Sequence, residues 1–138
     1  MTLVVVIVFM IGGWAYASSL LRISNTATIH TGSLLQATGA VTEGTQCSSI
    51  SGMYSGSPSI SWNVSTGSVS KNFVCIQNIG QGTYHVAITS TLTAAQGAIM
   101  SPQMGDVVLP GGFLLLELDW EVPADAQLGV VSFAVSIG

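Results

Sequence analysis

Four acidic residues near the end of the chain have the residue types and spacing of a candidate metal site. Glu117, Asp119 and Glu121 alternate along one predicted strand, and Asp125 follows in the next turn. Calcium binds carboxylate oxygens at about 2.3–2.6 Å, whereas same-face residues of a strand lie roughly 6.6 Å apart. A calcium site therefore needs ligands from a second strand or a neighbouring subunit. The alternatives are ion pairs with a neighbour's cations, or charges that protect an exposed strand face from aggregation.

Catalytic groups are scarce in the rest of the sequence. His30 and His85 are the only histidines, and both lie on the polar faces of predicted strands. The sequence contains no nucleophile elbow, no phosphate-binding glycine loop and no zinc-type cysteine spacing. We therefore expect no enzymatic activity, and no cofactor apart from the calcium ion considered above.

Two cysteines, Cys47 and Cys75, can form one disulfide or remain as two buried thiols. A bridge between them would close a loop of about 29 residues and stabilise the fold by roughly 3–4 kcal/mol. Because disulfides persist in exported proteins and the chain begins with an export-type segment, we expect the bridge.

Asn63 begins the tripeptide Asn63-Val64-Ser65, which has the N-x-S pattern of a glycosylation acceptor. A glycan there would lie on the surface of an exported protein. It would supply hydration that the composition lacks, so glycans are expected as additional partners at this position.

The charge content is very low for a folded domain. Only 6% of the 138 residues are charged, against about 25% in ordinary soluble domains, and the net charge is −4. Arg22 and Lys71 are the only fixed cations, which excludes the basic surface of a nucleic-acid-binding protein. Weak charge repulsion between copies suits a subunit that contacts its neighbours.

The first 21 residues form an apolar segment that permits three interpretations. Its length of about 20 residues is sufficient for a helix that spans a bilayer. Ala15-Tyr16-Ala17 also has the small-x-small pattern of a signal-peptide cleavage site. In the third interpretation the segment is a pilin-type helix, retained in a filament core. All three predict that residues beyond Ser18 are extracellular, with membrane contact only through residues 1–21 during export or anchoring.

The sequence after residue 32 predicts strands and no long helix. Apolar and polar residues alternate with a period of two between turns rich in Gly, Pro and Ser. The clearest alternation lies in residues 59–64, 83–92, 112–122 and 129–138, with a further strand around Cys75. Several short strands at this spacing predict an all-β fold, either a β-sandwich or a jelly roll.

The segment LLRISNTATIHT, residues 20–31, also alternates as a half-buried strand. Leu21, Ile23, Ala27 and Ile29 lie on its apolar face, which Asn25 interrupts. In the simpler interpretation, it is the first strand of its own sandwich. In the other, it leaves its own domain and completes a groove in the next subunit, with backbone hydrogen bonds along a sheet edge and side chains in pockets. Repeated head to tail, such a contact builds a filament.

The order of motifs is similar to that of the TasA/camelysin-like family of secreted β-proteins, especially archaeal subunits of bundling pili and cannulae. The resemblance covers roughly residues 18–138 and is carried by NTATIHTG, GTQCSSISGMYSG, SISWNVSTGSVS, NFVCIQNIGQGTYHVAITST and VLPGGFLLLELDWEVPADAQLGVVSFAVSI. It implies a jelly-roll-like sandwich whose copies polymerise by donor-strand complementation. It also implies that residues 18–31 form the donor strand, with Leu21, Ile23, Ala27 and Ile29 as its anchors.

We therefore expect three regions: an apolar signal peptide or retained helix in residues 1–17, a donor strand in 18–31 and a jelly-roll-like β-sandwich in 32–138. The expected function is a structural subunit of an extracellular, pilus-like filament made of copies of this chain. One alternative is an archaeal type IV-like pilin that keeps its apolar helix in the filament core. The other is a membrane-anchored surface binding domain.

Overall fold

The computed structural model describes residues 23–126 and 132–138, which form an all-β domain. The predicted apolar helix of residues 1–17, like residues 18–22 of the expected donor segment, lies outside the described residues. The elements are β1 (Ile23–Thr31), β2 (Leu35–Val41), the short 3-10 helix η1 (Cys47–Ser49), β3 (Ser59–Val64), β4 (Val69–Asn78), β5 (Tyr84–His85), β6 (Ile88–Ser90), β7 (Ala98–Met100), β8 (Val107–Val108), β9 (Phe113–Glu121) and β10 (Ser132–Ile137).

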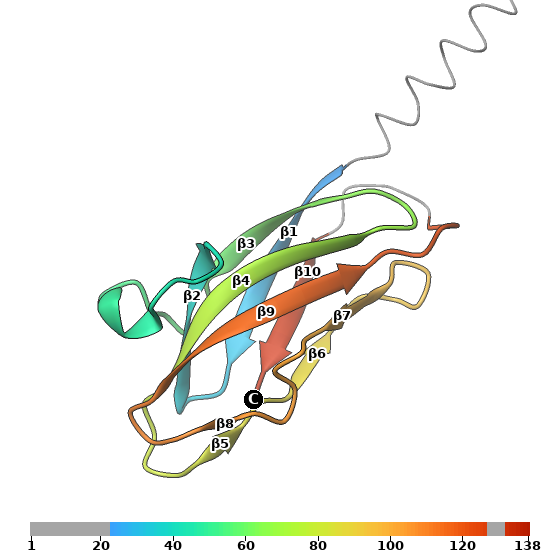
Figure 1. Ribbon diagram of the computed structural model, residues 1–138. Coiled ribbons are helices and arrows are strands. Elements are labelled where there is room, and N and C mark those ends of the chain that lie inside the picture. The colour runs from blue at the N-terminus through green and yellow to red at the C-terminus, as the bar shows by residue number, and fades with distance from the viewer. Residues whose placement is uncertain (1–22, 127–131) are drawn as a thin grey trace, which may run out of the picture.

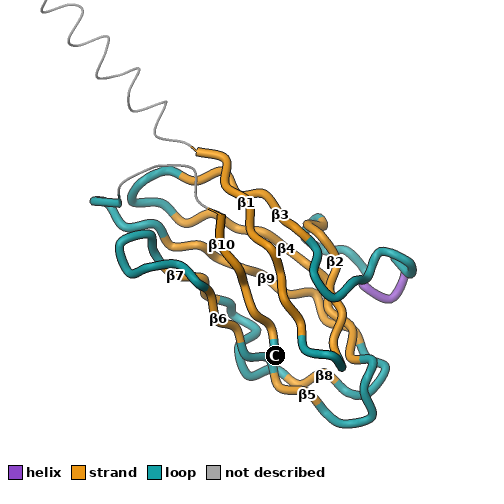
Figure 2. The backbone as a smooth tube through the Cα atoms, turned by 180° about the vertical axis from the view of Figure 1, so that it is seen from behind, coloured by secondary structure: helices purple, strands orange, loops and turns teal. Residues whose placement is uncertain are grey.

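Two four-stranded sheets pack face to face as a β-sandwich (Figure 1). The first sheet has the order β3-β1-β10-β6 and the second β2-β4-β9-β7, while β5 and β8 form a small third sheet. The strand pairs are antiparallel except for β1 and β10, which run parallel. From behind, β1 and β10 lie side by side in the middle of the first sheet (Figure 2).

The core lies between the two large sheets, and the predicted alternation is confirmed along three of the strands that form it. The buried residues of β3, β9 with its following residue, and β10 are Ile60, Trp62, Val64, Leu116, Leu118, Trp120, Val122, Phe133, Val135 and Ile137. Three rings pack edge to face at its centre. The Trp120 ring lies 5.8 Å from that of Trp62 and 4.9 Å from that of Phe133, and its Nε1–H donates to the Gln96 carbonyl at 2.9 Å.

The sequence predicted one strand in residues 83–92, but the structure divides this stretch between two sheets. Residues of β5 pair with β8, whereas β6 pairs with β10. The chain crosses between them at Ala87, whose carbonyl oxygen accepts a hydrogen bond from the Gly138 backbone N–H at 3.0 Å. Val86 and Ile88 are buried as predicted, so alternation identified the inward residues although it did not identify the break.

The strand β2 was not predicted from the sequence, because a bulge interrupts its alternation. The register with β4 shifts between Ala37 and Ala40, and the consecutive residues Ala37 and Thr38 are both fully buried. The Thr38 hydroxyl fills the gap in the ladder: it accepts a hydrogen bond from the Cys75 backbone N–H at 3.0 Å and donates one to the Gly39 carbonyl at 2.7 Å. A buried, hydrogen-bonded threonine does not produce a recognisable period of two.

Candidate functional site

The strand β1 occupies the middle of the first sheet and is hydrogen-bonded on both sides. Its register pairs residues 23–28 with β3 in the antiparallel direction and residues 26–31 with β10 in the parallel direction. Ala27 lies between Ile60 of β3 and Phe133 of β10. Without β1, the first sheet would therefore be divided by a groove between β3 and β10.

The inward side chains of β1 fill the core side of that groove. Ala27 and Ile29 are completely buried, and Asn25 is 2% exposed. Beyond the ladder, the Ile29 backbone N–H donates to the Pro58 carbonyl at 2.8 Å, and the Thr31 N–H donates to the Gly56 carbonyl at 3.2 Å. The outward residues Thr26 and His30 are exposed. The strand is thus held by main-chain bonds along its length and by side-chain anchors on one face.

In the single chain, the described part of the expected donor strand lies in the sheet of its own molecule. Ala27 and Ile29 occupy the chain's own core, so the sandwich of the described chain includes residues 23–31. Leu21 and the side chain of Ile23 lie outside what the structure describes. If copies exchange this strand, the anchor residues and pockets are the ones observed here.

The two ends of β1 lie at opposite ends of the sandwich (Figure 1). It begins at Ile23 opposite Val64, at what we call the N-terminal pole. It ends at Thr31, where residues 32–34 lead to β2 beside the small sheet β5-β8 and the C-terminus. We call residues 32–34 the hinge and this end of the sandwich the hinge pole. Within the described residues, the hinge is the only covalent connection between β1 and the rest of the domain.

Three exposed apolar residues at the hinge pole were not predicted from the sequence. Leu34, Ile79 and Leu109 are 60%, 47% and 63% exposed. The Ile79 backbone N–H donates to the Leu34 carbonyl at 2.9 Å, which joins the first two residues. An open pocket of about 250 Å³ lies beside them, lined by residues that include Leu34, Leu35 and Tyr84. The three exposed residues lie in turns from separate parts of the sequence, so no local pattern brings them together.

The acidic row lies on the outer face of the second sheet. Glu117 and Asp119 are partly buried, Glu121 is exposed, and Asp125 lies in the following turn. The Lys71 Nζ lies 3.6 Å from Glu117 Oε2, an ion pair within the molecule. Among the described residues, no three His, Cys, Asp or Glu side chains are grouped so that they could hold a metal ion. A calcium ion at this row would need ligands from another copy.

Asp119 has an unusual environment within this row. Burial raises its pKa to about 6, and the hydrogen bond and negative charge of Glu117 add to the effect. The charge of Glu121 raises the pKa further, while that of Lys71 lowers it. The Oδ1 atom of Asp119 is buried and has no hydrogen-bond partner. Asp119 therefore stays protonated to a higher pH than an ordinary aspartate, and above about pH 6 it carries its negative charge in an unfavourable environment.

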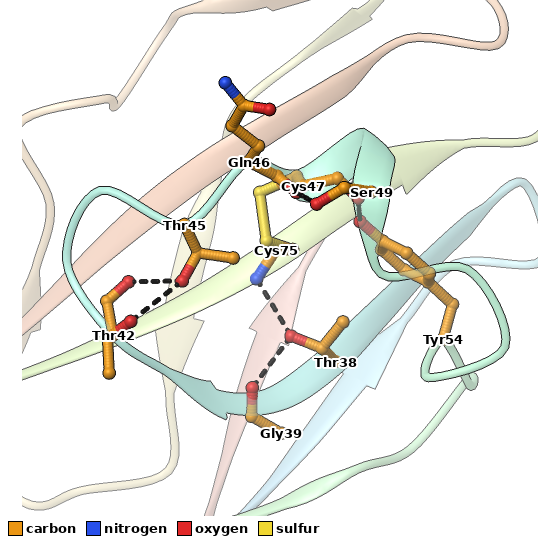
Figure 3. Close-up of a disulfide and its surroundings, with 9 residues drawn as sticks. All are labelled: Thr38, Gly39, Thr42, Thr45, Gln46, Cys47, Ser49, Tyr54 and Cys75. Atoms are coloured by element: carbon orange, nitrogen blue, oxygen red, sulfur yellow. Dashed lines mark hydrogen bonds between the residues drawn. A yellow bond between two sulfur atoms is a disulfide. The ribbon is translucent and has the colours of Figure 1, made fainter.

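The predicted disulfide between Cys47 and Cys75 is confirmed (Figure 3). The two Cα atoms lie 5.4 Å apart, and the bridge joins the η1 loop to β4 across 28 positions of sequence. The Tyr54 hydroxyl closes the same loop by donating to the Cys47 carbonyl at 2.7 Å. The bridge ties a long connection that contains only one short helix to the centre of the second sheet.

Asn63, the predicted glycan acceptor, lies on β3 with an exposed side chain. It is paired in register with Ser24 of β1, at the outer face of the first sheet. His30 and His85 are also exposed, on β1 and β5 respectively. The position of Asn63 is accessible to a glycosylating enzyme, and its modification remains a prediction.

Comparisons with known proteins provide no independent assignment. In the part of the chain that the structure describes, no helix has the length and apolar character needed to cross a membrane. No protein-family model, no curated protein and no solved structure matches this chain. The resemblance to the TasA/camelysin-like family therefore remains a prediction from short motifs.

Proposed function

We propose that this protein is a structural subunit of an extracellular filament, assembled from copies that exchange β1. The observation that supports the proposal most directly is the position of β1: the first described strand of the chain lies in the middle of a sheet. A strand that is bonded on both sides and has buried side chains on one face has the properties that a donor strand requires. In the proposed filament, the same groove receives β1 from a neighbour.

Two further features support an extracellular structural role. The Cys47–Cys75 bridge is typical of proteins that fold in an oxidising compartment. The low charge content leaves a surface of small polar residues with little repulsion between copies. The proposal retains the expected jelly-roll-like sandwich, although the parallel pairing of β1 with β10 differs from the antiparallel pairing of its other strands. It also retains residues 1–17 as a signal peptide or an apolar helix.

Two cysteines placed on neighbouring strands can detect exchange of β1. Thr26 and Ser61 are register partners on β1 and β3, and both side chains are exposed. The described residues contain no free cysteine that would compete with the introduced pair. In T26C/S61C, oxidation before assembly should lock β1 in its own molecule and prevent filament formation. Oxidation after assembly should link copies into a ladder on a non-reducing gel.

The matched control is V69C/E121C, whose positions are exposed register partners on β4 and β9. This pair should form only an internal bridge and leave filaments unaffected in electron micrographs. Assembly should be started by refolding from urea, because releasing β1 from a folded subunit breaks bonds on both of its sides. Filaments that form from the locked T26C/S61C subunit would support a pilin-type helical core. Dispersed monomers under all conditions would support the membrane-anchored binding domain.

A further inference from the structure

The short hinge limits how β1 can be exchanged. Thr31 ends β1 and Leu35 begins β2, so four Cα steps separate them. A fully extended chain of this length spans about 14 Å. The end of the donated strand must therefore lie within about 14 Å of the hinge pole of its own molecule.

Exchange in the direction seen in the single chain leads to a closed assembly. A β1 strand inserted parallel to the neighbour's β10 would end at the neighbour's hinge pole, as it does in its own molecule. The hinge poles of both copies would then meet, and the neighbour's own hinge begins at that same place. A reciprocal swap in a two-fold dimer satisfies this geometry, whereas in an open filament each hinge pole would lie within about 14 Å of the next, which crowds the sandwiches side by side.

Insertion in the opposite direction removes this conflict. A reversed β1 would end at the N-terminal pole of the acceptor, so the hinge pole of one copy would face the N-terminal pole of the next. The same contact can then repeat without closing, which gives a head-to-tail filament. In the acceptor's sheet, β1 would be antiparallel to β10 and parallel to β3. The reversed strand would therefore make one antiparallel and one parallel pair, as β1 does in the single chain.

The pattern of inward and outward residues in β1 is nearly symmetric about Thr26. Residues 23–29 read ISNTATI, and the reversed order is ITATNSI. Rotation about Thr26 exchanges Ile23 with Ile29 and Asn25 with Ala27, and it exchanges Ser24 with Thr28. Because strand side chains alternate with a period of two, this rotation keeps every inward residue inward. It places isoleucine at both ends of the groove in either direction.

We propose that β1 enters the neighbouring copy in the reversed direction, centred on Thr26. This inference rests on the proposed filament function and specifies its polarity.

Cross-linking at position 28 distinguishes the two directions. In the single chain Thr28 is paired with Ser59 of β3, and Asn63 is paired with Ser24. After the reversal, position 28 would lie beside Asn63. Positions 59 and 63 lie about 13 Å apart along the strand, which exceeds the reach of a disulfide. Filaments of T28C/N63C and of T28C/S59C should therefore give opposite results after oxidation.

We expect a ladder of linked copies from T28C/N63C filaments and none from T28C/S59C filaments. A ladder from T28C/S59C alone would overturn the reversed direction and leave the proposed function intact. If neither pair links copies, the reversed direction is also overturned. The T26C/S61C ladder would then show whether exchange itself occurs, because position 26 lies beside position 61 in either direction of insertion. In unassembled subunits T28C/S59C should form an internal bridge, which confirms that the introduced cysteines react in a folded domain.

Discussion

Replacement of Asp119 by asparagine should stabilise the subunit at neutral pH. Asp119 lies partly buried on β9 beside Glu117, with a buried Oδ1 atom that has no hydrogen-bond partner. Its pKa is raised from 3.8 to about 6, with burial as the largest cause and Glu117 next. Above pH 6 the folded protein therefore holds an unfavourable negative charge. Asparagine has nearly the same shape and removes that charge.

The raised pKa of Asp119 gives both the sign and the size of the effect. Between pH 3.8 and about 6 the folded state binds more protons than the unfolded state, so the free energy of unfolding falls as pH rises. The full difference in pKa corresponds to about 3 kcal/mol. Because solvent reaches part of this side chain and screens its charge, we expect about 1 kcal/mol. In a domain of this size that is a rise in Tm of roughly 4 °C.

The assay is urea unfolding of wild-type protein and D119N between pH 4 and pH 8. The stability gain of D119N should be near zero at pH 4, where Asp119 is protonated in the folded protein, and should reach its full value above pH 7. Asp106 is an exposed residue in a turn, so D106N removes the same charge elsewhere and serves as the control. A similar gain for D106N, or a gain for D119N that does not depend on pH, would refute the reasoning.

Three further predictions concern the disulfide, one glycine and metal binding. C47A/C75A should lose about 3–4 kcal/mol of unfolding free energy in urea titrations, because the bridge closes a 28-position separation, and an unchanged midpoint would contradict this. G97A should be destabilised by more than about 2 kcal/mol in thermal melts, because Gly97 has a φ of 113° and a Cβ there would collide with the Glu121 carbonyl. The control G82A has open space around the new Cβ and should melt at nearly the wild-type temperature. Excess chelator should leave the Tm of the unassembled subunit unchanged, since no metal-binding group of three is present among the described residues, and a lower Tm would indicate a bound ion.

The sequence predicted the strands whose alternation is undisturbed. The strands β3, β9 and β10 each have one face in the core and the other face directed outward, so the period of two in their sequences directly reflects burial. The bulged β2 has no such period, and β7 and β8 are too short to show one. Elements that are fixed by long-range pairing or by a single buried hydroxyl leave little trace in a local pattern.

The candidate site could be predicted only in part, because it too depends on contacts between residues that are distant in the sequence. The inward positions Ala27 and Ile29 follow from alternation, and the structure confirms that both are buried. The position of β1 between β3 and β10 could not be predicted, because it depends on contacts with residues 59–64 and 132–137. The raised pKa of Asp119 likewise depends on burial and on a hydrogen bond with Glu117, neither of which the spacing of the acidic row specifies.

The central position of β1 implies that the proposed exchange would depend on whether a neighbour's strand arrives before or after the subunit's own sheet has closed. A strand at a sheet edge can leave after breaking bonds on one side, whereas β1 is paired along both sides and also withdraws Ala27 and Ile29 from the core. Each exposed main-chain pair and apolar group adds to the free energy of opening. A folded subunit should therefore keep its own β1, and a neighbour's strand can compete best before the sheet closes. An extracellular subunit that folds as it is exported beside other copies meets that condition, whereas a folded monomer in dilute solution does not.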